Sequence, residues 1–322
     1  MDIVKIIRDA VDALPDGEYR AGLRAIQRHI GVAIKHFERD DDGELDSFTD
    51  AIYRCNQAFE GALKEAYRVL ANKDPSKVTP HKIEEYLEKN KVIRPRALKQ
   101  LTRYREDYRN PSAHDYKLDF DEDEALLAIT AVCAFTKLLT NQIASKVAFD
   151  KGKSAASTGV PKSVTSSEEM RQVIAEIIIE AMNATNASNL SYYEQLQFFL
   201  AGVLESSGYE VDQRPEDNGD PDDCCWNILV EHGDYRVAVE VRTVPHCNLR
   251  RSREWIEEEF GQESVENAIL VVSDNAKHSG FEALELSTER GGLTMIHPQD
   301  GLNPKVDEDE FASYLAIKSQ AS

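Results

Sequence analysis

Hydrophobic residues in the first part of the chain recur at the spacing of amphipathic helices. One apolar stripe follows steps of three and four residues and consists of Leu23, Ile26, Ile30 and Ile34. A longer stripe comprises Ile52, Cys55, Phe59, Leu63, Ala66 and Leu70. This spacing places apolar side chains on one face of a helix, and that face must be buried against another element. The pattern therefore predicts helices packed on helices.

Three further helices are predicted downstream. Thr79-Pro80 combines a capping residue with a proline in the first turn, and Pro95 begins the next helix. The acidic residues 121–124 precede a long apolar helix that is expected to run to about Ala144, because carboxylates stabilise the positive end of a helix. The first domain is thus predicted to be all-α.

The pattern becomes mixed in the second half of the chain. In order, we expect a helix over 169–182, a helix leading into a short strand over 191–211, strands over 226–231 and 235–244, a helix near 250–260, a strand over 267–273, a helix over 278–289 and a strand over 292–297. His232-Gly233-Asp234 between the first two long strands is typical of a hairpin. A hairpin followed by alternating helices and strands indicates a mixed sheet flanked by helices, so the second domain is predicted to be α/β.

A linker is predicted between the two domains. Residues 150–167 contain two Gly, one Pro and five Ser but no aromatic residue, and such a segment buries too little apolar surface to offset its ordering entropy. The predicted organisation is a helical extension at 1–45, a helical domain at 46–148, a linker at 149–168 and an α/β domain at 169–322.

Composition narrows the function classes. The 322 residues include 58 acidic and 38 basic side chains, for a formal net charge of −20. This charge argues against a protein that coats nucleic acid with a basic surface, although a local basic patch is compatible with it. No uninterrupted apolar run approaches the ~20 residues of a membrane span, and the N-terminus does not read as a secretory signal. With five scattered cysteines, we expect a cytoplasmic protein that does not enter a membrane.

The segment Arg-Asn-Pro-Ser-Ala-His at residues 109–114 is the strongest candidate for chemistry. Pro111 is expected to end a helix and to project Arg109 and His114 from either side of a turn. An imidazole can exchange a proton with a ribose oxygen near neutral pH, and a guanidinium can stabilise the charge on a phosphate in the transition state. The alternative explanation is a helix end where Arg and His complement the helix dipole.

This motif, lying between two amphipathic helices of which the second is long and apolar, resembles the HEPN family (higher eukaryotes and prokaryotes nucleotide-binding domains). The resemblance covers residues 46–148, and Arg109, Asn110 and His114 match the catalytic positions. It implies a helical bundle that forms a homodimer, with two facing motifs that make a metal-independent ribonuclease site. Many members are toxins or phage-defence effectors, and others only bind nucleotides or RNA.

A basic stripe leads toward this motif and favours RNA, including transfer RNA, as the partner. Between residues 91 and 109 there are seven basic residues and two acids. The predicted nucleic-acid contacts are Arg96, Lys99, Arg103 and Arg105. The alternative for these residues is an ordinary solvated helix face.

The second domain resembles the PD-(D/E)xK restriction-endonuclease-like fold, in particular its type IV restriction branch, over residues 190–300. The matched positions are Glu194, Asn227, Glu240 and Arg242. In that family an Asp, a Glu and a Lys hold Mg²⁺ and activate water. Here Asn227 stands at the Asp position, unless Asp222 or Asp223 takes it, and Arg242 stands at the Lys position. An arginine cannot act as a base, so this domain is expected to sense or bind a DNA or protein trigger.

No cofactor is expected for the ribonuclease, and Mg²⁺ is expected only if the second domain is active. The spacing does not favour a structural zinc site, because no Cys-x-x-Cys pair occurs among Cys224, Cys225, His232, His246 and Cys247. Two other functions stay open: a Mg²⁺-dependent DNA endonuclease that uses the second domain, and an inert binding or adaptor protein.

Overall fold

The computed structural model describes residues 2–39, 46–114, 117–156, 164–185, 193–213, 226–243, 255–256, 260, 265–273, 278–288 and 290–300. The chain divides into two compact units, Met1–Lys146 and Val147–Ser322. Among the described residues the first unit contains only helices, while the second contains a six-stranded mixed sheet. The prediction of an α domain followed by an α/β domain is confirmed at this level.

The described helices of the first unit include the three whose starts the sequence predicts, at Pro80, at Pro95 and at the acidic residues 121–124. The described helices are α1 (Ile3–Asp12), α2 (Tyr19–Phe37), α3 (Asp46–Ala71), α4 (Pro80–Lys89), α5 (Pro95–Tyr104), the π-helix η1 (Arg105–Arg109), α6 (Asn110–His114) and α7 (Glu122–Ala155). Thr79 caps α4 through Lys82 N, and Pro80 and Pro95 occupy the first turns of their helices. At the start of α7 the Asp121 side chain accepts from Glu124 N, and the Glu124 side chain accepts from Asp121 N. This reciprocal capping box satisfies backbone donors that a helix start leaves unpaired.

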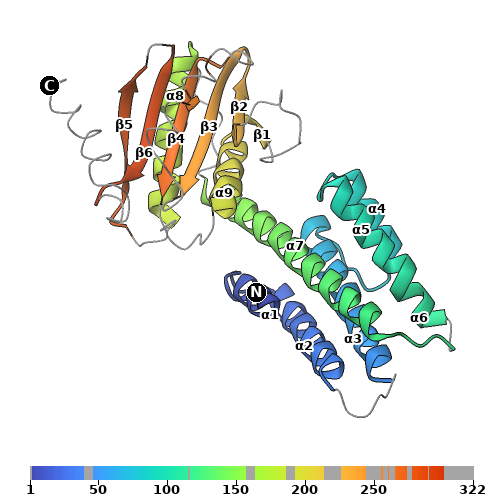
Figure 1. Ribbon diagram of the computed structural model, residues 1–322. Coiled ribbons are helices and arrows are strands. Elements are labelled where there is room, and N and C mark those ends of the chain that lie inside the picture. Colours follow the sequence, from blue (N-terminus) through green and yellow to red (C-terminus); the bar gives the residue numbers. More distant parts are fainter. Residues whose placement is uncertain are drawn as a thin grey trace. The chain divides into compact units, whose positions relative to one another are not determined.

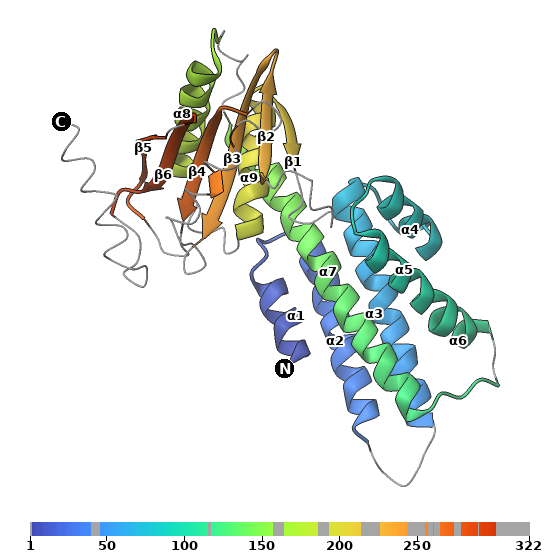
Figure 2. The ribbon, with the colours of Figure 1, turned by 45° about the horizontal axis from the view of Figure 1, so that its top comes forward.

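The core of the first unit lies between α2, α3 and the first part of α7, which run side by side in Figures 1 and 2. Both predicted stripes are buried, apart from their last members Ile34 and Leu70, which are half-buried. Phe59 of α3 contacts Phe135 of α7 and Tyr104 of α5, with ring centroids 6.3 and 4.8 Å apart. These contacts hold α5 and the segment after it against α3.

Helix α7 continues farther than predicted, to Ala155 instead of about Ala144. Its last turns belong to the second unit, where Ala148 is part of the apolar core. The first residues of the predicted linker are therefore helical, because they have a packing partner that composition does not reveal. By length and composition α7 could span a membrane, but half of its most apolar window is buried inside the protein.

The sheet of the second unit has the order β1-β2-β3-β4-β6-β5. Its strands are β1 (Glu210–Gln213), β2 (Ile228–His232), β3 (Tyr235–Thr243), β4 (Asn267–Ser273), β5 (Phe281–Ser287) and β6 (Gly292–Pro298). Strands β3, β4 and β6 are parallel, and the other neighbours are antiparallel. Helices α8 (Ser167–Thr185) and α9 (Tyr193–Ser206) cover one face (Figure 1). A second apolar cluster, which includes Trp226, Ile256 and Phe260, lies on the other face.

Most predicted elements of this unit are confirmed, and one is wrong. The hairpin turn is Gly233-Asp234, where Gly233 has a φ of +60° and His232 still pairs with Tyr235. The predicted helix over 278–289 is strand β5 instead. Glu, Ala and Leu favour a helix, but Leu284 and Leu286 are buried on either side of exposed Glu285, and pairing with β6 overrides the local propensity. Most of the predicted helix near 250–260 lies outside the described residues; the described residues Trp255 and Ile256 are helical.

Candidate functional site

The helix that carries Arg109 is not ended by Pro111. It widens into the π-helix η1, where Asn110 N donates to Arg105 O, and then continues as α6 through Pro111 to His114. In a regular α-helix the proline ring would clash with the carbonyl four residues earlier. A wider turn just before the proline moves that carbonyl aside. The expectation of a turn is therefore corrected: Arg109 and His114 belong to successive segments of one interrupted helix. Such interruptions occur often at functional sites.

The Arg109 guanidinium is held on two sides. Its Nε donates to Glu60 Oε1 of α3 at 2.7 Å, and its Nη1 donates to Asn110 Oδ1 at 3.2 Å. The side chains of Arg109 and Glu60 are 26% and 30% exposed. Two of the three predicted catalytic residues, Arg109 and Asn110, are thus brought into contact at an accessible edge of the first unit. The side chain of His114 lies outside the described part of the chain.

A buried hydrogen-bond network fastens this segment to α3. Tyr104 OH donates to Asn56 Oδ1 at 2.9 Å, and Asn56 Nδ2 donates to Ser112 Oγ at 2.6 Å. Ser112 Oγ in turn donates to the carbonyl of Arg109 at 3.1 Å. Burial raises the pKa of the Tyr104 phenol well above its ordinary value, and the nearby Cys55 and Tyr108 act in the same direction. The phenol therefore stays neutral and donates its proton within the network.

The motif alone did not identify Asn56, Glu60 or Ser112 as partners of Arg109. Asn56 and Glu60 lie one turn apart on α3, about 50 residues before the motif. Asn56 is buried beside the predicted apolar stripe of α3. A polar residue at a buried helical position is the signal that points to such a partner.

Some residues of the predicted basic stripe are exposed, whereas another forms an ion pair with a buried carboxylate. Arg96, Lys99 and Arg103 share one exposed face of α5. Among the described residues Arg96 and Lys99 make no ion pair, and Arg103 pairs with the exposed Asp107 at 3.1 Å. Arg105 differs from these residues, because its Nε contacts both oxygens of the buried Glu84 at 2.8 and 3.0 Å. Removing it would leave a buried carboxylate without its cation, so Arg105 has a structural role.

In the second unit Asn227 and Glu240 are neighbours in the sheet. Asn227 immediately precedes β2, and the register of β2 and β3 places it opposite Glu240. Asn227 N donates to Glu240 Oε2 at 3.2 Å, and Val241 N donates to Asn227 Oδ1 at 2.7 Å. Gln197 of α9 donates to the Asn227 carbonyl at 2.9 Å. Both predicted residues are almost completely buried.

Arg242 occupies the outer side of this pair. Its Nη2 lies 2.5 Å from Glu240 Oε1, and its guanidinium stands over the Trp255 ring at 5.7 Å. The side chain of Glu194 lies outside the described residues. The side-chain oxygens of Asn227 and Glu240 thus accept from backbone N–H groups, and Glu240 also pairs with a fixed cation. Among the described side chains, this set does not fit Mg²⁺, which requires accessible charged oxygens and would be repelled by the guanidinium.

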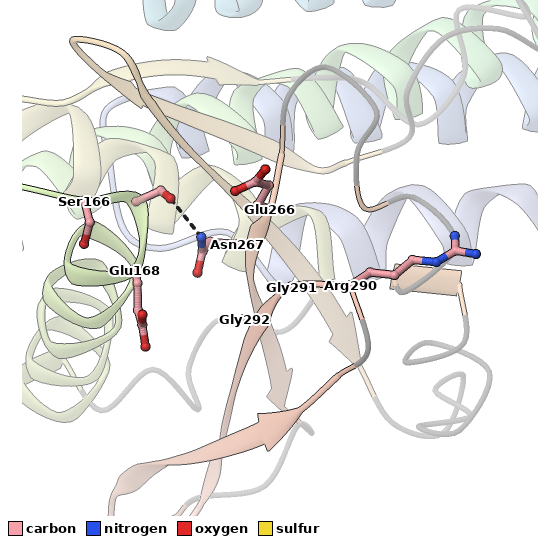
Figure 3. Close-up of a pocket in the computed structure, with 8 residues that line it drawn as sticks. Ser166, Glu168, Glu266, Asn267, Arg290, Gly291 and Gly292 are labelled. Atoms are coloured by element: carbon pink, nitrogen blue, oxygen red, sulfur yellow. Dashed lines mark hydrogen bonds between the residues drawn. The ribbon is translucent and has the colours of Figure 1, made fainter.

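An open depression of about 420 Å³ lies elsewhere in the second unit (Figure 3). Its lining includes the start of α8 with Ser167 and Glu168, the start of β4, and the Gly291-Gly292 turn. Asn267 Nδ2 donates to Ser167 Oγ at 3.0 Å across it. None of the residues that line it was predicted as a site residue. Its polar groups serve to anchor α8 to the sheet.

Comparisons with protein-family models, with curated proteins and with solved structures found no match for this chain. The resemblances to the HEPN family and to restriction-endonuclease-like proteins therefore stay predictions.

Proposed function

We propose that this protein is a metal-independent endoribonuclease whose site is built from Arg109, Asn110 and His114. The observation that carries the proposal is the placement of Arg109. Its guanidinium lies at an accessible edge, held by Glu60 and Asn110, on an interrupted helix whose earlier turns present Arg96, Lys99 and Arg103. The exposed cations can bind the phosphates of an RNA strand. The fixed guanidinium of Arg109 at the end of this row can then contact the phosphate that reacts.

The chemistry needs only groups of this kind. The ribose 2′-oxygen attacks the adjacent phosphorus and loses its proton to His114. The bond to the 5′-oxygen breaks, and that oxygen takes up a proton from the protonated His114 of a second, facing motif, which leaves a 2′,3′-cyclic phosphate and a 5′-hydroxyl end. Arg109 stabilises the additional negative charge on the phosphate in the transition state. An arginine can do this at any physiological pH because it stays charged.

A homodimer fits this chemistry. One imidazole cannot accept and donate a proton at the same moment, whereas two facing motifs supply two histidines. Leu126 and Leu127 of α7 are 50% and 61% exposed, which is unusual for adjacent leucines. These leucines are candidates for the dimer contact. In cells, the resemblance points to a toxin or phage-defence effector whose expression arrests growth.

For the second unit we propose a binding or sensing role. Glu240 is engaged by Arg242 and by a backbone N–H group, so its carboxylate is already occupied where the family would bind a metal ion and activate water. A nucleic acid or a protein trigger remains as the partner. Plasmid nicking in Mg²⁺ or Mn²⁺ that is lost in Glu240→Ala would favour the DNA-endonuclease alternative.

The decisive experiment follows an end-labelled RNA with purified full-length protein in EDTA. Wild type should leave 2′,3′-cyclic phosphate ends, and Arg109→Ala should be slower by about 100- to 1,000-fold. His114→Ala should be inactive. Arg68→Ala is the matched control, because Arg68 pairs with Glu65 on α3 outside the site. Cleavage by His114→Ala at the wild-type rate would refute the proposal.

A further inference from the structure

Glu60 is the acidic side chain in contact with Arg109. It projects from α3, and its Oε1 accepts from Arg109 Nε at 2.7 Å. Its other oxygen, Oε2, lies 3.9 Å from Lys64 Nζ one turn along the same helix. Neither contact belongs to the Arg-x4-His motif. The proposed chemistry above does not use this carboxylate, so its role needs its own explanation.

An exposed arginine needs to be held if its guanidinium is to act at one phosphate. Its side chain has several rotatable bonds, and ordering a free arginine costs rotamer entropy. Here Nε is bound by Glu60 and Nη1 by Asn110, whereas no hydrogen bond or ion pair of Nη2 is found among the described residues. Fixing two nitrogens leaves the third as the group presented to an incoming phosphate.

The helix that carries Glu60 is itself tied to the motif. One turn before Glu60, Asn56 binds Ser112, and Ser112 binds the carbonyl of Arg109. The side chain and the backbone of Arg109 are thus fastened to the same face of α3 by two independent routes. This arrangement restricts both the origin and the direction of the guanidinium.

We propose that Glu60 is a positioning residue for Arg109, which holds the guanidinium through Nε so that Nη2 faces the scissile phosphate. The inference rests on the proposed ribonuclease function and names a further residue of that same site. Substitution of Glu60 with glutamine distinguishes a positioning role of the carboxylate from an acid–base role. A positioning residue needs an acceptor oxygen, which glutamine also offers, whereas an acid–base residue needs a titratable group, which glutamine lacks.

The test compares Glu60→Ala and Glu60→Gln in the full-length protein, using EDTA-resistant RNA cleavage across pH. Loss of the Nε contact misplaces the guanidinium, and such misplacement can lower kcat by about 100-fold. We expect this loss in Glu60→Ala, with retention of most activity in Glu60→Gln and an unchanged pH profile in both. In an Arg109→Ala background, Glu60→Ala should cause no further loss. Glu65→Ala, which removes the acidic partner of Arg68 on the same helix, is the matched control.

The outcomes separate this inference from the proposed function. If Arg109→Ala and His114→Ala cleave like wild type, the ribonuclease proposal fails. If those variants are inactive while Glu60→Ala keeps the wild-type kcat, only the positioning role fails. Equal losses in Glu60→Gln and Glu60→Ala, with an altered acidic limb of the pH profile, would make Glu60 an acid–base group and overturn the assignment. Thermal unfolding of each variant identifies losses that come from misfolding, and the Glu60→Gln comparison remains decisive in that case.

Discussion

Asn56 connects two hydroxyl groups in the interior of the first unit. It accepts from Tyr104 OH and donates to Ser112 Oγ, and all three side chains are buried. A hydrogen bond adds only about 1 kcal/mol to stability, but leaving a buried polar group without its partner costs about 1–3 kcal/mol. Breaking the network is therefore expected to cost more stability than its hydrogen bonds contribute.

Replacing Asn56 with leucine should destabilise the first unit by about 2–3 kcal/mol, because the Tyr104 hydroxyl loses its acceptor. Adding Tyr104→Phe should recover part of that loss. Urea unfolding followed by far-UV circular dichroism reports the helices. Tryptophan fluorescence serves as an internal control, since Trp226 and Trp255 both lie in the second unit. A variant within about 0.5 kcal/mol of wild type would contradict the role assigned to the network.

The buried Cys133 thiol should make the protein less stable at alkaline pH. Burial raises its pKa from 9.0 to about 11, and burial also raises that of the neighbouring Cys55. Because the folded-state pKa of Cys133 is the higher one, its contribution is fully present below pH 9 and is lost as pH rises toward 11. Between these values wild type should lose about 3 kcal/mol more than Cys133→Ala. Parallel urea titrations at pH 8 and pH 11 measure this, and equal losses would contradict the shift.

At the residue scale, the sequence predicted features that depend only on residues close to one another along the chain. Arg109, Asn110 and the exposed cations Arg96 and Lys99 follow from a short motif and a helical period. Glu60 and Glu84 did not, because their contacts with Arg109 and Arg105 join residues 49 and 21 positions apart. A helical pattern predicts which face of a helix carries a cation. It does not predict whether a carboxylate distant in the sequence forms an ion pair with that cation.

Helices α7 and α9 approach unusually closely at two glycines. A Cβ atom at Gly152 would lie 2.0 Å from the Phe199 carbonyl oxygen, and one at Gly202 would lie 2.1 Å from that of Phe149. Each glycine therefore makes room for the backbone of the other helix. This crossing explains why α7 continues into the second unit, through residues that by composition read as the start of a linker.

Gly152→Ala should destabilise the second unit by about 1–3 kcal/mol, because the new methyl group meets backbone that cannot move aside. The general preference of alanine for helices acts in the opposite direction and is smaller. Gly31→Ala in α2 is the matched control, since its Cβ atom would meet no other atom within 4 Å. That control should be stabilised by about 0.5–1 kcal/mol. Unfolding followed by tryptophan fluorescence should shift for Gly152→Ala alone; an unshifted midpoint would contradict the close crossing.

Periodicity predicted most elements, and its failures have physical causes. The start signals at Pro80 and Pro95 depend on neighbouring residues, and the structure confirms them. Strand β5 was predicted as a helix because its composition favours one, whereas its conformation depends on pairing with β6. Pro111 was predicted to end a helix, but a widened turn upstream accommodates it. Both errors come from interactions outside the window that a pattern examines.

The molecule as a whole is strongly acidic, and this governs how an RNA would approach it. A formal charge of −20 repels a polyanion at long range. Binding then depends on a local concentration of cations, and the exposed face of α5 with Arg96, Lys99 and Arg103 provides one near Arg109. Helix α2 offers a useful comparison, because Arg24, Arg28 and Lys35 are also exposed on one helical face.

Exchanging Arg96, Lys99 and Arg103 for glutamine should weaken RNA binding and reduce its dependence on salt. Each phosphate contact to a single strand contributes about 0.7 to the slope of log affinity against log salt concentration. The triple variant should therefore lower that slope by about 2 and raise KM for RNA at moderate salt. The same exchange at Arg24, Arg28 and Lys35 changes the net charge equally but should leave the slope unchanged. Titrations of a fluorescent RNA into both variants, made inactive by His114→Ala, measure the difference; equal slopes would mean that overall charge, not the α5 face, controls RNA binding.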